Sequence, residues 1–213
     1  MSFAAIIVAS GSSRRMGFDK LAAPLVGKPV LWHSVGAFSK LDEISQVIVV
    51  TPPERFAWLA DLGDKLVRVD GGKERPDSVA AGLAELNEEI TYVAIHDGAR
   101  PLVSREAIRA TFDAVEETGA ACLARRVTET LKRATPEGIT TESVSRENLW
   151  IMETPQIFSK DLILEAYQKV GTGEAQITDE VSALQRLGHG TALVENRSPN
   201  PKITVSADLE RLG

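Results

Sequence analysis

Short apolar runs rich in β-branched residues alternate with amphipathic segments over the first two-thirds of the chain, and this alternation constrains the fold most. The runs that we interpret as strands cover residues 3–8, 44–50, 66–69, 92–95 and 120–124. Several are apolar almost throughout, as expected for strands that are covered on both faces of a parallel sheet. Strand and helix in alternation predict a layered α/β domain.

Amphipathic segments lie between and after these runs, at residues 78–86, 104–117, 160–170 and 179–187. In the second segment Ile108, Phe112 and Val115 recur at i, i+4 and i+7, the spacing of one helix face. Ser104 is placed to cap that helix, because its hydroxyl can accept a hydrogen bond from the first turn. We expect these helices to cover the predicted sheet.

Residues 125–148 show a different pattern, which predicts a projecting arm. The turn signal TPEG at 135–138 separates two short stretches that contain few apolar residues. A hairpin of this kind is only marginally stable alone, so it must pack against another surface. We therefore interpret the chain as a single domain, residues 1–213, in which a β-hairpin arm at 125–148 serves dimerisation.

Composition narrows the possible function classes. Lys plus Arg is 24 and Asp plus Glu is 30, and the resulting net charge of −6 argues against a nucleic-acid-binding protein. One cysteine, Cys122, excludes a disulfide framework and a cysteine-based zinc site. No apolar run approaches about 20 residues, so we expect no membrane partner and a cytoplasmic location.

The loop after the first predicted strand, ASGSSRRMG at 9–17, is the first candidate for binding chemistry. Its small residues let a phosphate approach backbone N–H groups, and Arg15 and Lys20 add positive charge. In an α/β sheet, ligands bind at this position, outside the carboxyl ends of the strands. The loop is neither a Walker A motif nor G-x-G-x-x-G, and an ordinary turn with surface cations is the alternative interpretation.

The second candidate is Asp97, which lies two residues after the end of the apolar run at 92–95. A carboxylate there is placed to hold Mg²⁺ or another divalent cation, which favours one or two carboxylates together with substrate phosphates. The alternative is that Asp97 pairs with Arg100 and caps a turn. We interpret His96 as structural, because no second His or Cys stands at ligand spacing.

A third candidate is the glycine pair Gly71-Gly72, which leads into a predicted helix. This geometry suits anion binding or recognition of a base by backbone groups. A plain strand-to-helix turn would give the same pattern. Cys122 lies in an apolar run and is interpreted as packed rather than reactive.

Taken in order, these motifs resemble the 2-C-methyl-D-erythritol 4-phosphate cytidylyltransferase family, and the match spans nearly the whole chain. The matching runs are the loop at 11–20, GGKERPDSV at 71–79, HDGARP at 96–101, Thr130 with Lys132-Arg133, Arg146 before Leu149-Trp150, TPQ at 154–156, ITDE at 177–180, and Asn200 with KIT at 202–204. The resemblance implies a Rossmann-like, mostly parallel sheet of the nucleotidyltransferase type. It also implies that a sugar-alcohol phosphate attacks the α-phosphorus of CTP and releases pyrophosphate, in the non-mevalonate route to isoprenoid precursors.

The resemblance further assigns roles to residues of this chain. The implied catalytic residues are Arg15, Lys20, Arg146 and Lys202. The implied CTP-binding residues are Ala9, Ser10, Gly11, Gly72, Lys73, Ser78 and Gly98. The implied contacts of the sugar alcohol are Arg100, Thr130, Thr154 and Thr178, and Asp97 would hold Mg²⁺. The implied partners are CTP, a sugar-alcohol phosphate and a second copy of the chain in a homodimer.

This reaction agrees with the absence of a Ser-His-Asp or Cys-His set. The second pKa of a phosphate monoester is about 6, so the attacking group is already ionised at neutral pH and needs no general base. The reaction instead needs two anions held in line and stabilisation of the developing negative charge.

Three positions depart from the family pattern. Ser13 stands where a second glycine is common, Lys73 stands where an acidic residue is common, and Pro201 removes a backbone donor beside Lys202. Two other functions stay open as alternatives: a ribitol 5-phosphate cytidylyltransferase, and a nucleotide-binding regulator without turnover. The GAR run at 98–100 favours the erythritol family over the first. The charges of Arg15, Lys20 and Asp97 argue against the second.

Overall fold

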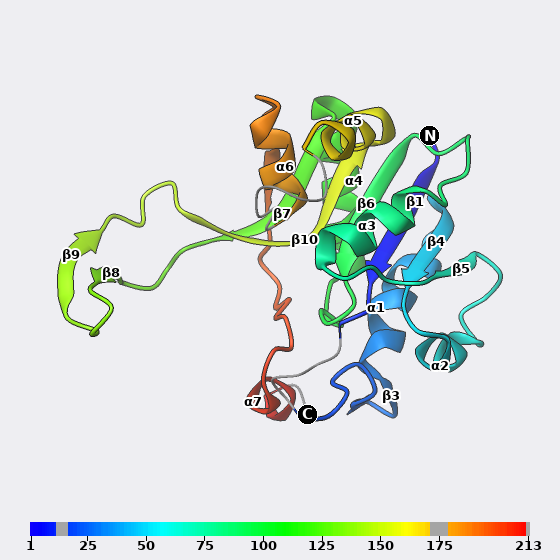
Figure 1. Cartoon of the computed structure of the whole chain (residues 1–213), viewed down its shortest axis with the longest axis horizontal. Helices are drawn as coiled ribbons and strands as arrows, with labels where there is room; N and C mark the ends of the chain where they lie inside the picture. Colours follow the sequence, from blue (N-terminus) through cyan, green and yellow to red (C-terminus); the bar gives the residue numbers. More distant parts are fainter. Residues whose placement is uncertain (12–16, 171–178, 212–213) are drawn as a thin grey trace.

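A seven-stranded sheet lies at the centre of the domain, with strand order β11-β7-β10-β6-β1-β4-β5 (Figure 1). The computed structural model describes residues 1–11, 17–170 and 179–211. The sheet strands are β1 (Phe3–Val8), β4 (Ile44–Val50), β5 (Leu66–Val69), β6 (Tyr92–Asp97), β7 (Ala120–Arg126), β10 (Trp150–Ser159) and β11 (Ala192–Glu195). Strand β10 runs antiparallel to its neighbours β6 and β7, whereas the other neighbouring pairs are parallel. The sheet is therefore mostly parallel, as the sequence predicts.

Helices cover both faces of this sheet and complete an α/β/α sandwich. Helices α1 (Val30–Ser39) and α4 (Arg105–Thr118) contribute to one core, and α3 (Arg75–Leu83), α5 (Lys160–Val170) and α6 (Glu180–Arg186) contribute to the other. Alternate strand residues feed the two cores: in β1, Ile7 belongs to the first and Ile6 to the second. The shorter elements are β2 (Pro24–Leu25), β3 (Lys28–Pro29), α2 (Pro53–Phe56), the 3-10 helix η1 (Ala57–Leu59) and α7 (Ser206–Glu210). In the part of the chain that the structure describes, no helix is long and apolar enough to cross a bilayer.

The predicted strands and helices are confirmed, with shifted ends. Helix α3 begins at Arg75 and ends at Leu83, three residues earlier at each end than its apolar spacing suggests. Ser104 caps α4 as expected, because its Oγ accepts from the Ala107 N–H at 3.1 Å. Helix α1 and strands β10 and β11 were not predicted. Strand β10 escapes a periodicity search because the polar run ETPQ at 153–156 interrupts its apolar pattern.

A hairpin of β8 (Leu131–Ala134) and β9 (Thr140–Val144) projects from the sheet as the predicted arm (Figure 1). The two strands pair only with each other in the described sheets. Most of the arm's side chains are exposed, including Ile139, which is 67% exposed. The arm therefore lacks a core of its own.

The carboxyl ends of β1 and β6 lie side by side, since Val8 pairs with Asp97 in the parallel register. The segment after β11 returns to this edge, where the Ile203 N–H donates to Ala99 O at 2.9 Å. Three stretches of chain thus meet at one edge of the sheet, where the candidate residues stand.

Candidate functional site

The loop after β1 contacts the first turn of α3 through two serines, and the loop after β5 joins them. Ser10 Oγ and Ser78 Oγ lie 2.9 Å apart, and the Gly72 N–H donates to Ser78 Oγ at 3.2 Å. On the other side, the Gly98 N–H donates to Val8 O at 3.0 Å. The structure therefore brings together the described residues that the resemblance assigns to CTP, apart from Lys73, whose side chain is exposed.

The glycine pair permits this close approach. A Cβ on Gly71 would stand 2.2 Å from Ser10 Cβ, and one on Gly72 would stand 2.2 Å from Asp77 Cβ. A Cβ at either distance would clash with its neighbour, so both positions require glycine. The bare backbone there leaves peptide groups accessible to a ligand.

Arg55, which the sequence analysis missed, anchors the loop after β1 through hydrogen bonds. This residue is 8% exposed. Its guanidinium donates to Ala9 O, to Gly11 O at 3.0 Å and to Asp19 Oδ2 at 2.7 Å. Because Arg55 contacts backbone oxygens of the loop, it occupies none of the N–H groups there, although the Ala9 N–H itself donates to Val50 O at 2.9 Å.

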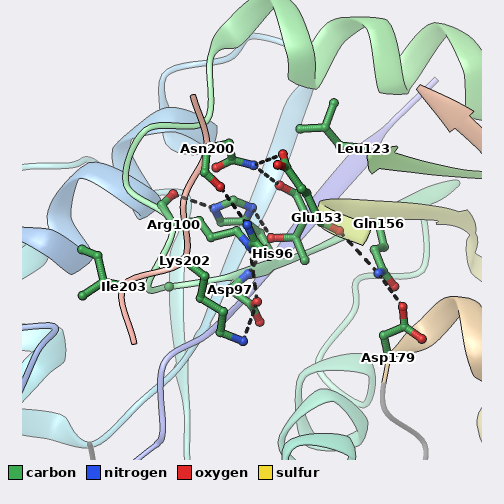
Figure 2. A network of polar contacts seen from close by, with 12 residues as sticks. His96, Asp97, Arg100, Leu123, Glu153, Gln156, Asp179, Asn200, Lys202 and Ile203 are labelled. Atoms are coloured by element: carbon green, nitrogen blue, oxygen red, sulfur yellow. Dashed lines mark hydrogen bonds and ion pairs between the residues drawn. The ribbon is translucent and has the colours of Figure 1, made fainter. Parts of the chain in front are cut away.

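Two lysines reach the site from opposite ends of the chain. Lys20 Nζ donates to Ile203 O at 2.7 Å, so this side chain lies against the C-terminal segment. Lys202 Nζ forms an ion pair with Asp97 Oδ2 at 2.8 Å, as Figure 2 shows. Pro201 causes no break here, because the neighbouring Asn200 and Ile203 make the backbone contacts that anchor the segment.

Asp97 is 8% exposed and is surrounded by positive charge. Arg75 Nε donates to its Oδ1 at 3.3 Å, and Arg100 Nε lies 3.6 Å from Oδ2, beside the Lys202 ammonium. The pairing with Arg100 that we gave as an alternative is thus present, together with two further cations. Burial alone would raise the pKa of Asp97, but these cations outweigh burial and hold its pKa below the usual range. Asp97 is therefore a carboxylate at neutral pH.

His96 and Thr154 fix the backbone at Asp97. Thr154 Oγ1 accepts from the Asp97 N–H at 3.1 Å and lies 2.9 Å from His96 Nδ1. Burial lowers the pKa of His96 to about 4, so the ring is neutral and Nδ1 can accept a hydrogen bond from the Thr154 hydroxyl. His96 Nε2 then donates to Arg100 O at 3.1 Å. Thr154, which the resemblance assigns to the sugar alcohol, is 4% exposed and stands behind Asp97.

A cavity of about 470 Å³ opens beside Asp97. Its lining includes Arg100, Arg125, Glu153, Asn200 and Lys202. Asn200 Nδ2 donates to Glu153 Oε2 and to Thr154 O, each at 3.0 Å, whereas Asn200 Oδ1 and Arg100 Nε are buried without a hydrogen-bond partner in the described part of the chain. The cavity therefore combines positive charge with polar atoms that could still bond to a ligand.

Other candidates lie apart from this cluster or outside the described residues. Thr130 and Arg146 belong to the arm and are exposed, and Arg146 donates to Thr128 O within the arm. Arg15, Thr178 and the departure at Ser13 fall outside the described residues.

Asp97 fits a hard divalent cation in charge and position. The Lys202 ammonium already occupies a cation position on Oδ2, and its side chain is 40% exposed. Among residues 1–11, 17–170 and 179–211, no three His, Cys, Asp or Glu side chains gather as a metal site. A Mg²⁺ ion bound to Asp97 would therefore take its other ligands from phosphates and water, a coordination that Mg²⁺ favours.

Comparisons with known proteins identify relatives of this chain. The model of the family described as IspD, 2-C-methyl-D-erythritol 4-phosphate cytidylyltransferase, matches residues 3–212. A 2-C-methyl-D-erythritol 4-phosphate cytidylyltransferase of Caldanaerobacter subterraneus is 36% identical, over 98% of this chain and 96% of the relative.

Two solved structures share the fold over the whole domain. A 4-diphosphocytidyl-2C-methyl-D-erythritol synthase of Anaerococcus prevotii superimposes with a TM-score of 0.87 and 26% identity, over 99% of this chain and 94% of that chain. The 2-C-methyl-D-erythritol 4-phosphate cytidylyltransferase of Francisella tularensis gives a TM-score of 0.83 and 29% identity, over 99% of this chain and 98% of that chain.

Proposed function

This chain belongs to the 2-C-methyl-D-erythritol 4-phosphate cytidylyltransferase family, and from that premise we propose how its residues perform the family's reaction. The enzyme is a nucleotidyltransferase of isoprenoid precursor synthesis that joins CTP to 2-C-methyl-D-erythritol 4-phosphate. A phosphate oxygen of the sugar alcohol attacks the α-phosphorus, the bond to the β-phosphate oxygen breaks, and pyrophosphate leaves. The observation that carries the proposal is the convergence of Lys20, Lys202 and Asp97 at the carboxyl edge of the sheet.

CTP would bind across the loops after β1, β5 and β6. Backbone groups at Ala9, Ser10 and Gly11 would face the triphosphate, and Arg15 and Lys20 would stabilise the charge that builds at the α-phosphorus. Gly72, Ser78 and Gly98 would meet the cytosine and ribose, with Lys73 at the rim. The contact of Ser10 with Ser78 supports this arrangement, because it fixes the spacing between the two parts of the nucleotide site.

The sugar-alcohol phosphate would bind in the cavity beside Asp97. Arg100 and Lys202 line it and can attract the phosphate, while the orphaned Asn200 Oδ1 can accept from a hydroxyl of the sugar alcohol. Thr154 would support this site, and Thr178 would complete it. The phosphate would draw Lys202 away from Asp97, which releases the carboxylate for a cation.

Asp97 would hold a divalent cation together with the phosphates of CTP. When bound, Mg²⁺ would neutralise charge on the triphosphate and orient it for in-line attack. The ionised state of Asp97 supports this role, since a protonated carboxyl would be a poor ligand.

A second copy of the chain would complete the site. We propose a homodimer in which the arm at 125–148 of each protomer covers the cavity of the other and supplies Thr130 and Arg146. The exposure of Ile139 and the position of Arg146 on a projecting arm support this assembly. A cytoplasmic location is also proposed, and the single buried cysteine agrees with it.

The substrate assignment is tested by a pyrophosphate-release assay with CTP and each polyol phosphate in turn. We expect turnover with 2-C-methyl-D-erythritol 4-phosphate and little with ribitol 5-phosphate. Faster turnover with ribitol 5-phosphate would favour that alternative substrate, and binding of CTP without pyrophosphate release would favour a nucleotide-binding regulator.

Replacement of Asp97 by asparagine tests the cation site. Asp97→Asn keeps the size of the side chain but removes its charge, so Mg²⁺-dependent binding of CTP should weaken by roughly tenfold or more. Isothermal titration with CTP at a series of Mg²⁺ concentrations measures the change. Asp61→Asn, which alters an exposed carboxylate paired with Lys28, is the control and should behave like the wild type. An unchanged Mg²⁺ dependence in Asp97→Asn would return Asp97 to a structural role.

A further inference from the structure

Glu180 is a buried carboxylate that the mechanism above does not use. It is the first residue of α6 and its side chain is fully buried. Both oxygens accept from one guanidinium: Arg75 Nη1 donates to Oε1 at 2.6 Å and Nη2 donates to Oε2 at 3.0 Å. The Tyr167 hydroxyl donates to Oε1 at 3.1 Å. Such a pair has the planar, two-bond geometry that fixes an arginine most firmly.

The same guanidinium reaches the candidate active site. Arg75 begins α3, next to the glycine pair, and its third nitrogen, Nε, donates to Asp97 Oδ1 at 3.3 Å. Burial would lower the pKa of Arg75, but Glu180 and Asp97 outweigh burial and raise it, so the group stays charged. Arg75 thus divides its donors between two carboxylates, with its terminal nitrogens on Glu180 and Nε on Asp97.

This division decides how much of Asp97 stays available to a ligand. An unrestrained guanidinium would turn its terminal nitrogens toward the nearest carboxylate, because a two-bond pair is stronger than one bond. Asp97 already forms ion pairs with Lys202 and Arg100. A second hydrogen bond from Arg75 would occupy acceptor positions on the Asp97 oxygens that a ligand would otherwise use. Without the charge of Glu180, three cations would also face one carboxylate and repel an incoming cation.

We propose that Glu180 is a positioning residue that holds Arg75 by both terminal nitrogens and so keeps Asp97 open to the divalent cation. The inference rests on the proposed cation role of Asp97. Gln156 supports the arrangement from β10, because its Oε1 accepts from the Glu180 N–H at 3.1 Å and fixes the start of α6. Glu180 acts through Arg75 and touches no substrate.

Three variants of the full-length protein test this role. Glu180→Gln removes the charge, Arg75→Met/Glu180→Gln removes both charges, and Tyr167→Phe removes only the hydroxyl bond to the same carboxylate oxygen. The measurement is isothermal titration with CTP at a series of Mg²⁺ concentrations and without the second substrate, so that no turnover occurs. Thermal unfolding of each variant reports its fold.

Glu180→Gln should raise the Mg²⁺ concentration for half-maximal CTP binding roughly tenfold, because a freed Arg75 competes for Asp97. The double variant should return to within about threefold of the wild type, since the Arg75 guanidinium is no longer present to compete and a buried pair can be replaced without large loss. Tyr167→Phe should stay within about twofold, because it keeps the charge and the two-bond pair. An unchanged Glu180→Gln, or a double variant as impaired as Glu180→Gln, overturns the inference.

A further pair of variants keeps the test decisive. If Glu180→Gln shows no cooperative unfolding transition, Glu180→Asp replaces it. The shorter side chain loosens the pair and should shift the Mg²⁺ concentration for half-maximal CTP binding roughly threefold in the same direction. No shift overturns the inference.

Asp97→Asn, titrated in the same way, separates the two proposals. If Asp97→Asn alters the Mg²⁺ dependence and Glu180→Gln does not, the positioning role alone is wrong. If Asp97→Asn has no effect, the cation role is wrong and the inference is wrong with it.

Discussion

Lys20→Ala is expected to lower kcat by about 10²-fold or more, with a smaller effect on the affinity for CTP. The reason is that Lys20 would act on charge that develops only as the α-phosphorus is attacked. Its ammonium donates to Ile203 O at 2.7 Å, which anchors the side chain, and a charge that is already positioned costs less reorganisation during the reaction. Steady-state rates of pyrophosphate release, together with titration of CTP, separate the two effects.

Lys28→Ala is the matched control, because it also removes one lysine. Lys28 forms an exposed ion pair with Asp61 at 2.6 Å, away from the site, and exposed pairs contribute little. This variant should turn over like the wild type. Arg15→Ala should resemble Lys20→Ala if the loop at 9–17 faces the α-phosphate. Near-normal rates in both Arg15→Ala and Lys20→Ala would show that the loop has another role.

The sequence predicts the parts of the fold in which local pattern and burial agree. The run at 3–8 is apolar because both faces of β1 are covered, so its limits match the strand. Strand β10 was missed for the opposite reason. Its central residues Glu153, Thr154 and Gln156 are buried but polar, and they bond to the site and to α6 instead of packing in the core. Apolar spacing cannot reveal a strand that is built around polar contacts.

The residues of the candidate site likewise differ in whether the sequence alone can reveal them. Lys20 and Lys202 stand in loops and Asp97 ends β6, all within recognisable motifs, and the structure brings them to one edge of the sheet. Arg55 belongs to no motif, and Glu180 was noted only as part of the ITDE run at 177–180, without a role, because the roles of both residues depend on partners distant in the chain. Glu180 lies 105 residues from Arg75. Only the folded topology places those two residues together, and a single sequence carries no local signal of it.

Mixing two inactive variants should restore activity if the arm completes the site of the neighbouring protomer. Lys20→Ala damages the body of the site and Arg146→Ala damages the arm. In a hybrid dimer, one site would carry both lesions and the other neither. Random exchange makes about half of the dimers hybrid, and half of the sites in each are intact, so activity should recover to about a quarter of the wild-type value. Pyrophosphate release after subunit exchange measures this recovery.

The design separates an arm that reaches across the dimer from one that folds back on its own protomer. If Arg146 served its own site, each site of a hybrid would carry one lesion and no activity would return. Exchange itself must be shown independently, for example by mass spectrometry of tagged protomers. The exposed Ile139 supplies a physical reason to expect the crossing, because a hairpin without a core gains stability when its apolar side chains pack against a second copy. No recovery despite demonstrated exchange would therefore assign Arg146 to the site of its own protomer, and the arm would not complete the neighbouring site.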